Sequence, residues 1–162
     1  MFDSEITTRS TAVLSLCRAR QWTVATVESC TGGLVSGALT AIPGSSDVVT
    51  GGLVTYSNQA KSALAGVPEE LIRQHGAVSE PVARAMAECG RARLGVDLAV
   101  AITGIAGPGG GSAAKPVGLV HFACAAGGRT LHREKRFGDL GRDEIRRLSV
   151  ITALELMRDT AR

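Results

Sequence analysis

Apolar residues recur along this chain at two different spacings, and each spacing predicts its own kind of element. Apolar positions three or four residues apart cover residues 3–20 and 143–160, which predicts a helix near each end. Short β-branched or continuous apolar runs at 23–28 and 98–102 predict strands, and the second run has the composition of a strand covered on both faces. Helices and strands should therefore alternate.

Glycine and proline mark where these elements end. Residues 29–33 form a glycine turn that leads from the first strand into a helix over 34–42. A strand over 48–57 follows, and its two adjacent glycines predict a bulge or a close approach of another chain segment. A short helix over 59–66 comes next.

The second half of the chain carries a longer glycine-rich segment. A helix with small inner residues begins after Ser79, whose hydroxyl should cap it. The apolar strand that follows runs into the glycine-rich residues 103–112, and two strands over 117–125 and 130–137 are expected to form an antiparallel hairpin.

These elements predict the α/β class, with residues 1–162 as a single domain. The expected architecture is a three-layer sandwich in which a mixed β-sheet lies between helices. Ligands of such folds bind at the loops that leave the carboxyl ends of the strands. The glycine segments at 29–33 and 103–112 both leave strands in this way, so we expect the functional site there.

The amino-acid composition excludes several classes of function for this chain. The 162 residues are 44% hydrophobic and 20% charged, ordinary values for a folded globular protein. Aromatic residues make up only 3%, so a nucleic-acid surface built on stacking has almost nothing to stack with. The net charge of +3 is also too small for a general polyanion binder, and we expect no nucleic-acid partner.

The basic excess is concentrated near the C-terminus. Residues 129–147 hold seven Lys and Arg against four acidic residues, so the whole +3 resides in this segment. A local excess of this kind fits a small anionic ligand such as a phosphate, although a solvated face is the commoner reason for it.

Metal and membrane chemistry are not indicated. The four cysteines are widely spaced, with no CxxC pair and no histidine at ligand spacing, so we expect no metal, no cofactor and no disulfide framework. No apolar run approaches the ~18 residues that span a bilayer, and the first residues do not have the pattern of a signal peptide. We expect a cytoplasmic protein.

Two segments carry candidate catalytic groups. The 29–33 turn places hydroxyls and unencumbered backbone N–H groups where a strand meets a helix, which suits an anion or a developing oxyanion, although a plain helix cap is an equally good interpretation. Tyr56, the only tyrosine, lies five residues before Lys61, one of only three lysines. Unlike arginine, a lysine can release a proton near neutral pH and activate a serine, for which Ser46 and Ser29 are the candidates.

Five motifs in a fixed order resemble the C-terminal domain family of the competence/damage-inducible protein CinA. They are Glu28-Ser29-Cys30-Thr31-Gly32-Gly33, Pro43-Gly44-Ser45-Ser46, Val54-Thr55-Tyr56-Ser57-Asn58 with Lys61, His75-Gly76-Ala77-Val78-Ser79-Glu80, and Thr103-Gly104-Ile105-Ala106-Gly107-Pro108-Gly109-Gly110 with Lys115-Pro116-Val117-Gly118. Within that family the chain is similar to stand-alone nicotinamide-nucleotide amidases. The resemblance implies hydrolysis of the carboxamide of nicotinamide mononucleotide to nicotinate mononucleotide and ammonia, in pyridine-nucleotide salvage.

The resemblance also implies which residues form the site. Its catalytic positions fall on Ser46 as nucleophile, Lys61 as general base and Tyr56 as proton relay or oxyanion donor, with Ser29 as the alternative nucleophile. The substrate-binding positions are Thr31, Gly32, Gly33, Thr103, Gly104, Gly107 and Arg142, with Arg146 as the second choice for the phosphate-binding arginine. We expect a homo-oligomer. A catalytically silent nucleotide-binding module, linked to competence or the response to DNA damage, is the alternative function.

Overall fold

The computed structural model describes all residues, 1–162, as a central sheet with helices on both faces. The helices are α1 (Ser4–Ala19), α2 (Leu34–Thr40), α3 (Asn58–Ala63), α4 (Glu69–His75), α5 (Glu80–Leu94) and α6 (Arg142–Thr160), with a 3₁₀ turn η1 (Ser45–Asp47). The strands are β1 (Val24–Glu28), β2 (Val49–Val54), β3 (Leu98–Gly104), β4 (Leu119–Ala126) and β5 (Arg129–Arg136).

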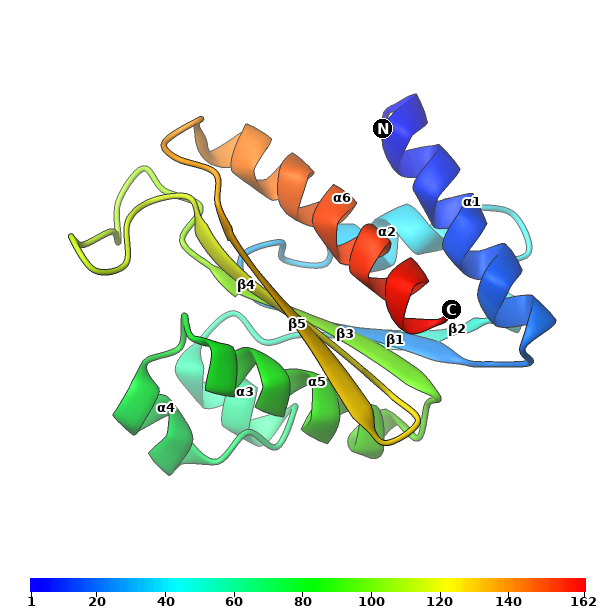
Figure 1. Ribbon diagram of the computed structural model, residues 1–162, viewed down its shortest axis with the longest axis horizontal. Coiled ribbons are helices and arrows are strands. Elements are labelled where there is room, and N and C mark those ends of the chain that lie inside the picture. The colour runs from blue at the N-terminus through cyan, green and yellow to red at the C-terminus, as the bar shows by residue number, and fades with distance from the viewer.

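The sheet is mixed and has the order β2-β1-β3-β4-β5. Strand β1 pairs in parallel with both β2 and β3, whereas β3, β4 and β5 pair antiparallel. Helices α1, α2 and α6 cover one face, and α3, α4 and α5 lie on the other (Figure 1). The predicted α/β class and the sheet between two helical layers are confirmed.

Each layer encloses its own part of the core. Strands β3 and β4 are buried almost throughout, which explains their continuous apolar sequences. A larger cluster fills the space between the sheet and the α1, α2 and α6 layer, and a smaller one lies under α5. The small residues of α5 allow a close approach, because a Cβ on Gly90 would lie 2.5 Å from a methyl group of Val27.

Three local predictions need correction. Helix α4 was not predicted, because its apolar pattern covers barely two turns. Ser79 does occupy the N-cap position of α5, but its hydroxyl donates to Gly76 O at 2.8 Å and does not cap the helix. Strand β2 ends at Val54 and not at residue 57. The bulge or close approach expected at its two glycines is confirmed, because the register shifts between Val24 and Ala25 of the neighbouring strand and a Cβ on Gly52 would lie 2.5 Å from Thr26 Oγ1.

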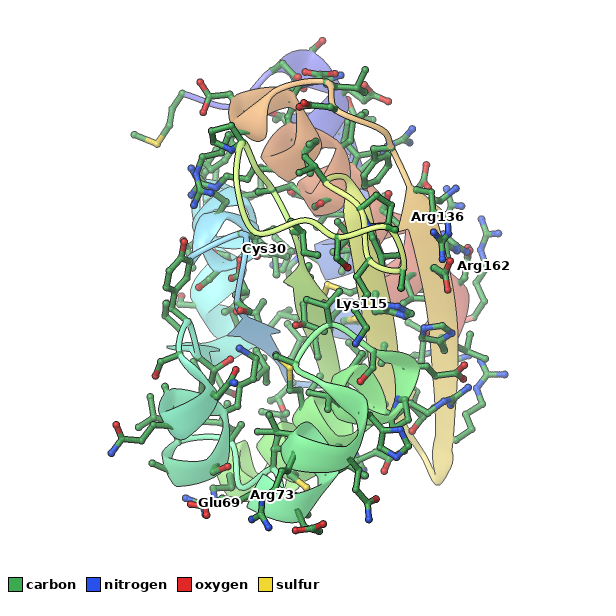
Figure 2. The ribbon with its side chains drawn as sticks, turned by 90° about the vertical axis from the view of Figure 1, so that its left-hand side faces the viewer. Cys30, Glu69, Arg73, Lys115, Arg136 and Arg162 are labelled. Carbon is green, nitrogen blue, oxygen red and sulfur yellow. The ribbon has the colours of Figure 1, made fainter.

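The parallel strands bring three loops to one edge of the sheet. Strands β2, β1 and β3 run in the same direction, so the segments that follow them emerge side by side. Figure 2 shows the molecule turned by 90° from Figure 1 and labels Cys30 of the 29–33 turn and Lys115 of the long glycine-rich loop. Nearly all candidate residues lie at this edge, and the exception is Ser46.

Candidate active site

The 29–33 turn joins β1 to α2 at the centre of this edge. Ser29 N donates to Ile102 O of β3 at 2.9 Å, which continues the sheet pairing by one residue. Gly32 and Gly33 have φ angles of +57° and +99°, the left-handed region in which glycine carries no steric cost. Both glycines are thus needed to turn the chain sharply after the serine.

Glu28 binds the start of the helix that follows this turn, a role that was not predicted from the sequence. Its carboxylate is buried and accepts hydrogen bonds from Thr26 Oγ1 at 3.0 Å and from the backbone N–H groups of Val35 and Ser36 at 2.9 Å each. The first-turn donors of α2 are therefore already occupied by a carboxylate, and the expectation that they serve a ligand or an alkoxide is corrected. The sequence signal for this role is an acidic residue directly before the glycine turn.

Lys61 is the most unusual side chain of the site. It is only 2% exposed, and its Nζ lies 3.0 Å from Ser29 Oγ, 3.0 Å from Thr55 O and 3.5 Å from Tyr56 O. No carboxylate pairs with it, so burial lowers the pKa of Lys61 below its usual range. In the structure Nζ donates to all three oxygens. Once it loses a proton, the amine still has two donors for the carbonyls and a lone pair for the Ser29 hydroxyl.

Ser46 does not belong to this cluster. It lies exposed in η1, before the start of β2, whereas Lys61 follows the other end of that strand. The six residues of β2, each about 3.3 Å long, separate the two side chains. The expected pairing of Ser46 with Lys61 is corrected, and the hydroxyl beside Lys61 is that of Ser29.

Cys30 follows Ser29 directly but is not a competing nucleophile. Its thiol is buried, and this burial raises its pKa to about 12. The thiolate is therefore scarce at neutral pH.

Tyr56 and Arg142 meet at the exposed mouth of the site. Arg142 donates to Tyr56 Oη at 2.9 Å and to Gly107 O at 2.9 Å, which ties the β2–α3 connection to the glycine-rich loop. Tyr56 is 59% exposed, and the atom that it turns toward Lys61 is its backbone carbonyl oxygen. The phenol thus stands at the rim, not between Lys61 and Ser29.

The glycine-rich loop after β3 forms the second wall. Thr103 is buried and donates to Ala77 O at 2.8 Å, so it anchors the neighbouring 76–79 turn. A Cβ on Gly104 would lie 2.9 Å from Leu119 O, which requires glycine there. The backbone N–H groups of Ala106, Gly107 and 109–111 donate to no protein acceptor and remain free for a ligand.

Two further polar groups of the site merit notice. The Thr31 hydroxyl has no hydrogen-bond partner although the residue is fully buried. Arg146 donates from α6 to Cys30 O at 3.2 Å and to Thr31 O at 3.3 Å. Both predicted arginines of α6 therefore reach the site, one at the rim and one behind the turn.

The other cations of residues 129–147 do not form a ligand site. Arg133 pairs with Glu155 and Asp159, and Arg147 pairs with Asp3 and Glu144. Arg136 also pairs with Glu134, so three of these five cations meet carboxylates of the protein, which favours the interpretation as a solvated face.

Two histidines that are not part of this site contact one another on neighbouring strands. His121 Nδ1 of β4 lies 3.0 Å from His132 Nε2 of β5, and the ring centroids are 5.2 Å apart. That centroid distance is about the N···N distance plus one ring radius on each side, so the imidazoles meet edge to edge in line. Glu80 and Glu134 face the outer nitrogens at 3.5 and 3.9 Å.

The structure contains no group of three or more His, Cys, Asp or Glu side chains arranged to hold a metal ion. None of its helices combines the length and the apolar character that a membrane span requires.

Comparison with known proteins places these features in a family. The family model for the CinA C-terminal domain matches residues 6–161. A CinA-like protein of Synechococcus sp. (strain RCC307) is 54% identical over 158 residues, which are 97% of this chain and 38% of that protein. One of Gloeobacter violaceus (strain ATCC 29082 / PCC 7421) is 56% identical over 137 residues, which are 84% of this chain and 32% of that protein. The chain thus spans about a third of the length of these curated relatives.

Solved structures agree over the whole chain. The competence/damage inducible protein CihA from Agrobacterium tumefaciens superposes with a TM-score of 0.98 at 48% identity, covering 100% of this chain and 99% of that one. A CinA superfamily protein from Escherichia coli gives a TM-score of 0.91 at 32% identity, covering 97% of this chain and 91% of that one. With its fold, its five motifs and the family model all in agreement, this chain belongs to the CinA C-terminal domain family.

Proposed function

We propose that this protein hydrolyses the carboxamide of nicotinamide mononucleotide to nicotinate mononucleotide and ammonia, with Ser29 as nucleophile and Lys61 as general base. The observation that carries the proposal is the contact of 3.0 Å between the Lys61 amine and the Ser29 hydroxyl. A buried lysine without a carboxylate partner is costly to keep charged, and such a group serves well as a base.

The first half of the reaction forms an ester on Ser29. Lys61 takes the hydroxyl proton as Ser29 Oγ attacks the carboxamide carbon. The negative charge passes to the carbonyl oxygen, and the backbone N–H of Thr31, which donates to no protein acceptor, is available to receive it. The C–N bond then breaks as the Lys61 ammonium gives its proton to the leaving amide nitrogen, which departs as ammonia.

The second half releases the acid. Lys61 removes a proton from a water molecule that attacks the ester carbon, and the bond to Ser29 Oγ breaks. The proton returns to Ser29, which regenerates the free enzyme and nicotinate mononucleotide. This sequence needs one nucleophile and one base that reverses its role, and the Ser29–Lys61 pair supplies both.

The rest of the site suits a phosphorylated ribose. The free N–H groups of Ala106 and the following glycines present donors at the mouth, beside the exposed guanidinium of Arg142. Tyr56, placed at the rim, becomes a substrate contact in this proposal and not a proton relay. The choice of nicotinamide mononucleotide among carboxamides rests on the family's motifs.

The experiment compares two serines in one assay. Purified protein is incubated with nicotinamide mononucleotide, and ammonia and nicotinate mononucleotide are quantified. Ser29→Ala should lower kcat by at least ~10³-fold, whereas the matched control Ser46→Ala should stay within a few-fold of the parent. Acid quenching during turnover should trap an acyl group on the peptide that contains Ser29.

Two outcomes would contradict the proposal. Release of no ammonia by the unmodified protein would favour the catalytically silent binding module. A Ser29→Ala variant that keeps its rate would move the nucleophile elsewhere.

A further inference from the structure

Arg146 is the side chain that donates hydrogen bonds to the backbone of the 29–33 turn. It lies in the second turn of α6, and its Nε and Nη2 donate to Cys30 O at 3.2 Å and Thr31 O at 3.3 Å. The contact spans more than a hundred residues of sequence. A guanidinium that binds two consecutive carbonyls fixes the orientation of two consecutive peptide planes.

These peptide planes decide where their N–H groups point. In a trans peptide the C=O and N–H bonds are coplanar and point in opposite directions. The carbonyl of Cys30 belongs to the same peptide as the N–H of Thr31, and this N–H donates to no protein acceptor. The next N–H, that of Gly32, closes the turn by donating to Ser29 O at 3.0 Å. Only the first of the two N–H groups is therefore left for a ligand.

The positions of α6 and α3 show toward which face of the sheet the C=O and the N–H of the Cys30–Thr31 peptide point. Helix α6 lies on one face of the sheet and α3, which carries Lys61, lies on the other (Figure 1). Arg146 holds the Cys30 carbonyl from the α6 side, so the Thr31 N–H, on the opposite side of that peptide plane, points away from α6. Lys61, which α3 carries, contacts Ser29.

We infer that Arg146 is a positioning residue, which holds the Cys30–Thr31 peptide so that the Thr31 N–H faces the oxyanion formed during attack by Ser29. The inference rests on the proposed function and adds to it the group that organises its oxyanion donor. A cation on the carbonyl oxygen also withdraws electron density from the peptide, which makes its N–H a stronger donor.

The competing role for Arg146 is direct binding of a substrate phosphate. Two of its nitrogens are already used on the turn, and its side chain lies behind that turn, in a groove of about 330 Å³ with Phe2, Leu34 and Val150. A positioning residue and a phosphate ligand make different predictions for a substrate that lacks the phosphate.

The kinetic experiment uses Arg146→Gln, Arg146→Lys and the control Arg147→Gln. Arg147 is the next residue of the same helix, but it pairs with Asp3 and Glu144 and does not touch the turn. We expect Arg146→Gln to lower kcat by roughly 10–10²-fold with little change in KM, since loss of one oxyanion donor costs about 10²–10³-fold. The loss should be equal on nicotinamide mononucleotide and nicotinamide riboside, and Arg147→Gln should keep the parent rate.

Chemical rescue distinguishes loss of the guanidinium group from a folding defect of the variant. Methylguanidinium added to Arg146→Ala should restore part of kcat, and Arg146→Lys, which can reach one carbonyl, should fall between the parent and Arg146→Gln. A loss confined to the phosphorylated substrate would overturn the inference in favour of phosphate binding. An unchanged kcat in a folded Arg146→Gln variant would overturn it as well.

A measurement without substrate separates this inference from the proposed function. The amide resonance of Thr31 in ¹H–¹⁵N spectra should shift in Arg146→Gln and stay in place in Arg147→Gln. If the unmodified protein released no ammonia, the proposed function would fail, but the Thr31 resonance would still test whether Arg146 holds the Cys30–Thr31 peptide. A Thr31 resonance that does not move in Arg146→Gln would refute the inference about Arg146.

Discussion

Lys61 Nζ lies 3.0 Å from Ser29 Oγ, although 32 positions separate the two residues in the chain. Neither residue has an acidic partner that could hold the amine as an ammonium ion. The lysine is held by two backbone carbonyls of the segment that follows β2, and the serine continues β1. Parallel pairing of these strands therefore creates the contact, and the predictions below test what the contact does.

Replacement of Lys61 by arginine should be nearly as damaging to kcat as replacement by alanine. Arginine keeps the charge, but its pKa above ~12 prevents it from accepting the Ser29 proton near neutral pH. Lys61→Met should remain folded, because an apolar side chain of similar length replaces a buried amine that has no ion-pair partner. Initial rates and thermal melts of the three variants check this. An arginine variant within a few-fold of the parent would remove the general base from the mechanism.

The lowered pKa of Lys61 has a consequence for stability that does not depend on the reaction. In the folded state the amine loses its proton below its ordinary value of 10.5, whereas the unfolded chain keeps that proton up to about that pH. Between the folded pKa and 10.5 the unfolded state binds more protons, so this group makes the free energy of unfolding rise with pH. Urea titrations across this window should show a smaller rise in Lys61→Met. Equal slopes in both proteins would mean that the folded amine has an ordinary pKa.

Arg142 and Tyr56 should act as one unit at the rim of the site. The guanidinium donates to the phenol oxygen and to Gly107 O, so removal of either partner frees the glycine-rich loop from the β2–α3 connection. In a double-mutant cycle, Arg142→Ala combined with Tyr56→Phe should lower kcat/KM no further than Arg142→Ala alone. Additive losses would instead mean that Arg142 and Tyr56 act on the substrate independently of one another, and not through their shared hydrogen bond.

Thr31→Val should stabilise the protein and impair its reaction. The buried Thr31 hydroxyl has no partner, and an unsatisfied buried polar group costs about 1–3 kcal/mol, so the isosteric valine should raise the free energy of unfolding by about 1 kcal/mol. If this hydroxyl meets the substrate, as the family resemblance implies, kcat/KM falls roughly tenfold. Thr152→Val is the matched control, because the Thr152 hydroxyl already donates to Leu148 O. Loss of stability in Thr31→Val would show that its hydroxyl is paired in the free protein.

The in-line histidines should make the fold sensitive to acid. Burial first, and the neighbouring imidazole second, lower the pKa of His121, and burial also lowers the pKa of His132. The folded protein therefore takes up these protons at a lower pH than the unfolded chain, whose histidines titrate near 6.5. Stability is complete above that pH and is lost as the pH falls from 6.5 toward the folded pKa values. Denaturant titrations from pH 7 to 5 should show a smaller loss in His121→Phe. The carboxylates of Glu80 and Glu134 oppose this effect, and an acid-insensitive parent would mean that they prevail.

Local sequence signals were sufficient for most of the secondary structure. The apolar spacing predicted α1 and α6, continuous apolar runs predicted the buried strand β3, and paired glycines predicted the turn between β4 and β5. These signals work because burial of one helix face, or of both faces of a strand, leaves its period in the sequence. The predicted helix cap at Ser79 was wrong, because the same hydroxyl had a competing acceptor within its own loop.

The positions of the two serines relative to the strands indicate which one can meet Lys61. Ser29 follows a strand and Ser46 precedes one, and only carboxyl ends of parallel strands share an edge. Sequence alone, however, leaves open whether β1 and β2 are parallel, since their pairing depends on contacts between distant residues.

The alternating elements, the two glycine-rich turns, the scarce lysine and the hydroxyls of this protein are all evident from its sequence. The fold was needed to show which hydroxyl meets Lys61, that Glu28 occupies the first turn of α2, and that Arg142 lies at the rim while Arg146 lies behind the turn. This is because hydrogen bonds depend on distance in space. Periodicity reports which face of an element is buried, but the partners of a buried polar group are chosen by the packing of the whole sheet and its two helical layers.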